Sequence, residues 1–98
     1  MEKISKPRVK SLGEGATLTV KQMKATAGEL LPKHSASNES VLVVVEGECV
    51  FNLSGTEHVL AAGDTLVIPQ GVKHQIKVSE DFTAIHIMPP GIEFDYSE

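Results

Sequence analysis

The stretch GDTLVIPQGVKH, residues 63–74, is the part of the sequence that decides the fold. It predicts a tight turn, a short strand rich in β-branched residues, a second turn and a histidine at the start of another strand. Gly63 and Gly71 fit the two turns because glycine adopts positive φ without a steric penalty. Past the second turn, His74 and Ile76 share one face of the new strand. Because the apolar face of a strand is the covered one, we expect the imidazole of His74 to point inward.

The order of glycine, proline and histidine in this stretch resembles the second conserved motif of the cupin superfamily, G-x5-P-x-G-x2-H-x3-N, with Val78 at the final position. Residues 28–47 resemble part of the first cupin motif, G-x5-H-x-H-x3-E-x6-G. The positions that match one motif or the other are Gly28, His34, Gly47, Gly63, Pro69, Gly71 and His74. The resemblance spans about half of the chain. It implies an all-β fold, the double-stranded β-helix or jelly-roll barrel of cupins.

Two positions of the first motif depart from the family pattern. Ala36 stands where cupins have a second histidine, and Ser40 stands where they have a glutamate. Cupins typically hold a divalent transition metal with three histidines and one glutamate, and neutral imidazoles suit such metals. The resemblance therefore implies His34 and His74 as the two remaining metal ligands. Because one imidazole and the only charged ligand are missing, we expect a degenerate metal site.

Three other side chains are candidates for a third ligand. His86 lies on the expected last strand and would complete a set of three histidines, which is a known catalytic zinc arrangement. Glu39 is next to Ser40, but strand alternation turns it to the opposite face. His58 shares a face with Leu60, at a depth that the pattern does not define. Each has a plainer interpretation. His86 is then a hydrogen-bonded interior or interface histidine, Glu39 a solvated carboxylate and His58 a surface imidazole.

The sequence predicts an inward-facing ligand pocket formed by side chains of several strands. Its expected members are His34, Ala36, Ser40, Leu42, Phe51, His74, Ile76 and His86. One functional hypothesis is a small-molecule-binding module in which the metal site is lost. The other, implied by the resemblance, is a metal-dependent enzyme of dioxygenase, isomerase or cyclase type that uses His34, His74 and His86. A third interpretation makes His34 and His74 a structural pair, bonded to each other, to Ser40 or to water.

Length and turn spacing predict a single domain, residues 1–98, with an N-terminal arm at 1–10 and an acidic tail at 93–98. Short strands with turn residues every eight to twelve positions are typical of an all-β sandwich or barrel. Among them we expect strands at 40–46 and 49–53, separated by a turn, and a final strand at 82–88 that follows a polar turn at 79–81.

Composition excludes several classes of partner. The net charge of −4 argues against a nucleic-acid surface. Cys49 is the only cysteine, so we expect a buried thiol, no disulfide and a cytoplasmic location. The longest apolar run, residues 41–45, is too short to cross a membrane. That run and residues 82–88 are apolar on both faces, as in strands covered on both sides, and we expect a homodimer, as the resemblance implies.

Overall fold

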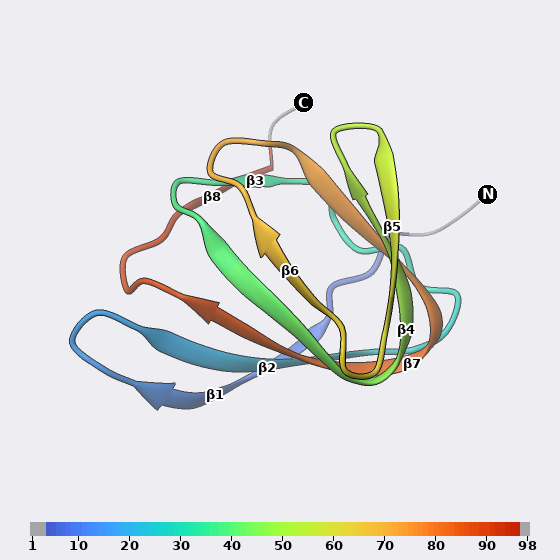
Figure 1. Cartoon of the computed structure of the whole chain (residues 1–98), viewed down its shortest axis with the longest axis horizontal. Helices are drawn as coiled ribbons and strands as arrows, with labels where there is room; N and C mark the ends of the chain where they lie inside the picture. The colour runs from blue at the N-terminus through green and yellow to red at the C-terminus, as the bar shows by residue number, and fades with distance from the viewer. Residues whose placement is uncertain (1–3, 97–98) are drawn as a thin grey trace.

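The computed structural model describes residues 4–96, which form eight β-strands, and no helix lies within that range (Figure 1). Accordingly, no helix of the described residues is long and apolar enough to cross a membrane. The strands are β1 (Arg8–Glu14), β2 (Thr19–Ala25), β3 (Ser35–Ala36), β4 (Ser40–Leu53), β5 (Thr56–Ala61), β6 (Thr65–Ile68), β7 (His74–Met88) and β8 (Phe94–Asp95).

Two long antiparallel strands, β4 and β7, organise the sheet. They pair along almost their whole length, from Val41 opposite Ile87 to Leu53 opposite His74. One half of this pair is extended by β6 and by β2 and β1, and the other half is extended by β5. The sheet curls so that the two halves face each other, and the short β3–β8 pair lies near one end (Figure 1). The fold is therefore the all-β jelly-roll barrel that the sequence predicts.

The bend between the two halves of β4 lies at Gly47. The predicted turn at residues 46–48 is wrong, because β4 continues through these residues with irregular register against β7. The predicted turn at 79–81 is wrong for the same reason, since β7 also continues. Gly47 has a φ of +78°, and a Cβ there would collide with the backbone carbonyl of Asp81. Bulges bend a strand without ending its pairing, and their polar residues resemble those of turns.

The core lies between the two halves of the sheet and is made by alternate residues of β4 and β7. As predicted, Cys49 and Phe51 face inward, and each has 0% of its surface exposed. Burial, with a smaller contribution from the nearby Glu48, raises the pKa of Cys49 to about 11. The thiol is therefore protonated at neutral pH, which fits the expected structural role and excludes a reactive thiolate.

Part of the expected arm and part of the expected tail belong to strands. Residues 8–10, predicted as part of the arm, belong to β1, which pairs with β2. Residues 94–95, predicted as part of the tail, form β8 and pair with β3. Residues 1–3 and 97–98 lie outside the described range. The strand signal of β1 is weak in the sequence because edge strands commonly carry the charged side chains that it has.

Candidate functional site

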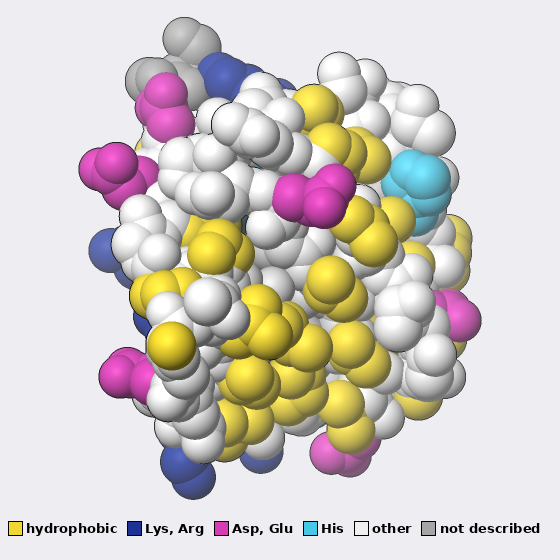
Figure 2. Space-filling model, turned by 60° about the vertical axis from the view of Figure 1, so that its left-hand side comes forward, with side chains coloured by type: hydrophobic (Ala, Val, Ile, Leu, Met, Phe, Trp, Pro, Cys, Tyr) yellow, Lys and Arg dark blue, Asp and Glu magenta, His cyan; other side chains and the backbone are white. Residues whose placement is uncertain are grey.

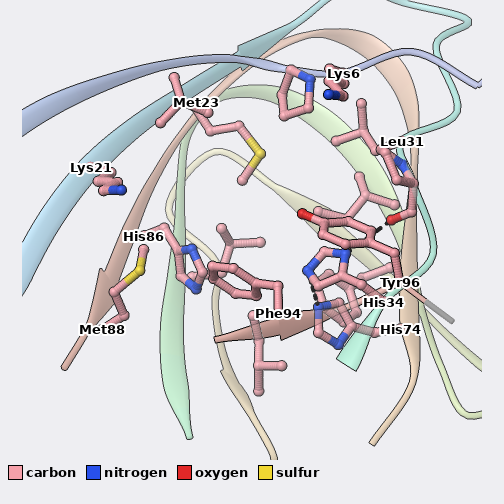
Figure 3. Close-up of a pocket in the computed structure, with 17 residues that line it drawn as sticks. Lys6, Lys21, Met23, Leu31, His34, His74, His86, Met88, Phe94 and Tyr96 are labelled. Atoms are coloured by element: carbon pink, nitrogen blue, oxygen red, sulfur yellow. Dashed lines mark hydrogen bonds between the residues drawn. The ribbon is translucent and has the colours of Figure 1, made fainter. Parts of the chain in front are cut away.

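A cavity of about 530 Å³ lies inside the barrel and is lined by residues from both halves of the sheet (Figure 3). Six of the eight expected pocket residues line it: His34, Leu42, Phe51, His74, Ile76 and His86. The other two, Ala36 and Ser40, do not line the cavity, and both are buried.

The two histidines in motif register meet across an isolated β-bridge. The backbone N–H of His34 donates to the carbonyl of His74 at 3.0 Å, and the reverse bond is 2.8 Å long. These two reciprocal backbone hydrogen bonds fix both Cα atoms and turn the rings toward each other. The ring centroids are 4.4 Å apart, and the two Nε2 atoms are separated by 3.1 Å. The ring of His74 also stacks on Phe51, with 5.2 Å between centroids.

The hydrogen-bond partners of these rings define their protonation. His34 Nδ1 lies 3.0 Å from the carbonyl oxygen of Pro32, and His74 Nδ1 lies 3.2 Å from that of Val72. A carbonyl oxygen only accepts, so both Nδ1 atoms must carry the hydrogen. In two neutral rings both Nε2 lone pairs then point at each other. The contact is favourable only when a proton, a donated hydrogen or a cation lies between the two Nε2 atoms.

Burial opposes the proton that this contact requires. Desolvation, followed by repulsion from His34, lowers the pKa of His74 to about 4, although the bond to Val72 acts in the opposite direction. The histidine pair therefore presents the acceptor Nε2 of a neutral His74 to the Nε2 of a second ring whose Nδ1 carries the hydrogen. Chemically, it is suited to a hydroxyl or acid group of a ligand, or to a metal ion.

His86 occupies a separate end of the cavity. Its Nε2 shares a hydrogen bond of 2.8 Å with the hydroxyl of Ser40. Desolvation lowers the pKa of His86 to about 4, and repulsion from His74, His34 and Lys21 adds to the effect. The ring of Phe94 lies between this end and the histidine pair, with centroid distances of 6.4 Å to His86 and 5.3 Å to His34 (Figure 3).

The other candidate ligands lie away from the pair. Glu39 is exposed, and His58 lies on β5 opposite Phe51 in register; neither lines the cavity. Among residues 4–96, no group of three or more histidine, cysteine, aspartate or glutamate side chains could hold a metal ion. The structure thus brings His34 and His74 together and leaves His86 apart.

Several lining residues were not predicted. Phe94 and Tyr96 come from the expected tail, and their rings lie 5.3 Å and 5.0 Å from that of His34. Lys21 and Met23 reach the cavity from β2, and Lys6 lies at its margin. The sequence did carry a signal for Phe94 and Tyr96. Alternate residues of a strand share a face, so two aromatic residues at positions 94 and 96 could have been predicted to line the same surface.

The family model for the Cupin domain matches residues 21–89 of this chain. A search of curated protein sequences finds no match. Among solved structures, an RmlC-like cupin from Shewanella frigidimarina NCIMB 400 is 28% identical and has a TM-score of 0.78. That match covers 85% of this chain and 75% of that one.

Two enzymes share the fold at lower sequence identity. The polyketide cyclase RemF from Streptomyces resistomycificus is 15% identical with a TM-score of 0.85, over 95% of this chain and 72% of that one. A salicylate 1,2-dioxygenase from Pseudaminobacter salicylatoxidans is 18% identical with a TM-score of 0.78. It is matched over 82% of this chain and 25% of its own length.

Proposed function

This chain belongs to the Cupin domain family, and we propose that it is a small-molecule-binding member whose ligand occupies the cavity between the histidine pair and His86. The observation that carries the proposal is the pair of Nε2 atoms 3.1 Å apart, in rings whose Nδ1 atoms both face backbone carbonyls, at the wall of a cavity of about 530 Å³. A ligand hydroxyl would supply the hydrogen that the pair lacks.

The remaining walls support the same function. Ligand pockets typically have volumes of about 300–1,000 Å³ and are mostly apolar, with a few polar groups that orient the ligand. This cavity falls within that range and is mostly apolar; Leu31, Ile68 and Met88 are among its walls. The three histidines are among its few polar side chains. An apolar body with one donor group would satisfy both features.

A neutral aromatic alcohol, 1-naphthylmethanol, tests the proposal. The chain has no tryptophan and one tyrosine, Tyr96, so naphthalene fluorescence excited at wavelengths that tyrosine does not absorb reports binding. We expect saturable binding of one molecule per chain, weakened about tenfold by His74→Phe, which keeps a ring against Phe51 and removes the acceptor. The matched control is His58→Phe, outside the cavity, which should bind as wild type does. Absence of binding, or equal affinities for both variants, would refute the proposal.

A second candidate function is that of a metal-dependent enzyme, and one observation favours it. Histidines that bind metals commonly donate their other ring N–H to a backbone carbonyl, as His34 and His74 both do. Two imidazole nitrogens 3.1 Å apart can both bind one ion at about 2.1 Å. In this function the metal would act as a Lewis acid toward substrate, and the two rings would hold it.

The residues fit such a metal only in part, because catalytic sites usually provide three protein ligands. His86 is the remaining histidine, and its Nε2 is bonded to Ser40 while Phe94 lies between. Elemental analysis of protein purified without chelator decides the matter. Stoichiometric transition metal that disappears in His74→Ala would establish the metal function, and no metal after incubation with Zn²⁺, Ni²⁺ or Fe²⁺ would eliminate it.

We also propose that the chain forms a homodimer through the outer face of β2, β7, β4 and β6. Val41 lies at the centre of this face, paired with Ile87 of β7 and Val67 of β6, and Ile87 also pairs with Val20 of β2. Hydrophobic side chains gather over one face of the molecule in Figure 2. A flat apolar face matches a second copy of itself across a twofold axis.

Sedimentation measures this assembly directly. Wild-type protein should sediment as a dimer at micromolar concentration, and Val41→Lys should sediment as a folded monomer because it places a charge at the centre of the face. Thr56→Lys, at an exposed position of β5 and outside the proposed face, is the control and should leave the dimer intact. A monomeric wild type would refute the proposal.

A further inference from the structure

We propose that the cavity selects apolar molecules that carry one anionic group, a carboxylate or a sulfonate, and that this group binds beside Lys21. The inference rests on the proposed small-molecule function and specifies the ligand class. It comes from the distribution of charge around the cavity, which differs from that of the whole chain.

All charged side chains that line the cavity are cationic. They are Lys6 and Lys21, and the other titratable side chains of the lining are the three histidines and Tyr96. No aspartate or glutamate is among the lining residues within the described range. The chain as a whole has 13 acidic residues against 9 basic ones, so a lining without a carboxylate departs from its overall composition. An anion entering the cavity therefore meets no repelling carboxylate among the described residues of its walls.

Lys21 is the central residue of this arrangement. It is half-buried on the inward face of β2 and lies directly opposite His86 in the pairing of β2 with β7. Side chains at such opposite positions have Cβ atoms about 5 Å apart. The positive charge of Lys21 also contributes to lowering the pKa of His86. Lys21 and His86 thus form one polar end of the cavity (Figure 3).

The ammonium group of Lys21 has no anionic partner among the residues that the structure describes. Within residues 4–96, no carboxylate oxygen lies within ion-pair distance of it. A half-buried ammonium loses part of its hydration and gains nothing in return until an anion approaches. A ligand carboxylate beside Lys21 would supply that anion, and the apolar body of the ligand would extend between Met23, Ile68 and Met88.

Three probes with the same aromatic body test the ligand class. They are 1-naphthoate, the neutral 1-naphthylmethanol and the cationic 1-naphthylmethylammonium, titrated calorimetrically at pH 7.5 and low salt. We expect 1-naphthoate to bind at least tenfold more tightly than the alcohol, and the cation to bind more weakly than both. Raising NaCl from 20 to 500 mM should weaken 1-naphthoate binding several-fold and leave the alcohol unaffected, since salt screens partly exposed charges.

Two variants on the same strand separate a local effect of Lys21 from general charge. Lys21→Met keeps the length of the side chain and should reduce the preference for 1-naphthoate over the alcohol to less than twofold. Lys24→Met, exposed and on the opposite face of β2, removes the same charge and should preserve the preference.

The outcomes distinguish this inference from the proposed function. If the alcohol binds as tightly as 1-naphthoate, or if Lys21→Met retains the preference, the anionic ligand class is wrong and small-molecule binding stands. If none of the three probes binds, both proposals are overturned. Should Lys21→Met fail to fold by circular dichroism, the salt dependence of the wild type decides alone, and an unchanged 1-naphthoate affinity in 500 mM NaCl contradicts the inference.

Discussion

Each of the two ends of the cavity contains a histidine whose pKa is lowered to about 4: the buried His74 at one end and the half-buried His86 at the other. Burial is the largest cause in each case. At one end, His86 has a complete partner in the hydroxyl of Ser40, which can donate or accept. At the other, His74 faces a second ring that offers the same kind of lone pair. Desolvation thus lowers both pKa values, but one ring has a hydroxyl as its partner and the other has a second imidazole nitrogen.

The largest effect on stability is expected at Gly47, where β4 bends between the two halves of the sheet. Gly47→Ala should reduce the free energy of unfolding by at least about 3 kcal/mol, because the Cβ collides with backbone and the φ is positive. The measurement is urea unfolding followed by circular dichroism. Gly55→Ala is the control: its φ is +92° and its Cβ would have no atom within 4 Å, so it should cost about 1 kcal/mol. Equal losses in the two variants would contradict this account of the bend.

The second prediction concerns pH and the titration of the two ends. The pKa of His86 is about 4 in the folded chain against 6.5 for the free side chain. Between these values the unfolded chain binds the proton first, so the free energy of unfolding falls as the pH falls from 6.5 toward 4. The same sign applies to His74. Above pH 6.5 neither ring contributes to the pH dependence.

His86→Gln isolates one end, because glutamine can bond to Ser40 and does not titrate. Between pH 7 and pH 4.5 the wild type should lose about 2 kcal/mol more than this variant, after allowance for partial solvent exposure of the ring. Carboxylates titrate equally in both proteins and cancel in the difference. Parallel curves of unfolding free energy against pH would show that His86 is not destabilised by protonation.

The smallest effect tests whether the Ser40 end is the satisfied one. Ser40→Ala leaves the Nε2 of His86 without its partner and should cost about 1–2 kcal/mol in urea unfolding at pH 7. Ser79→Ala, at an exposed position of β7, should change stability by less than about 0.5 kcal/mol. If the two variants are equally stable, the bond between Ser40 and His86 contributes nothing and the contrast between the ends is weaker than described.

The parts of this architecture that the sequence predicts are those that depend on local backbone requirements. Gly63 and Gly71 have φ values of +95° and +74°, as the two turns demand. His74 points inward because the alternation of its strand places it beside Ile76, and both are buried. These features follow from residues within a few positions of one another.

The missed features depend on pairing between distant segments. Lys21 enters the site because β2 pairs with β7, and Phe94 enters because β8 pairs with β3. Neither pairing has a local signature, since the partner strands are separated by more than fifty residues. Phe94 also lies between His86 and the other two histidines. Because its position could not be read from the sequence, the sequence did not show that His86 is separate from the other two.

The β3–β8 pair also has a kinetic consequence. Two residue pairs, Ser35 with Asp95 and Ala36 with Phe94, hold the segment that carries Phe94 and Tyr96 over the cavity. We expect such a short ladder to open far more often than the long pairing of the fifteen-residue strand β7 with β4. Backbone amides of residues 94 and 95 should therefore exchange with deuterium long before those of residues 49–51, and a molecule can reach the interior through this fraying without any unfolding of the barrel.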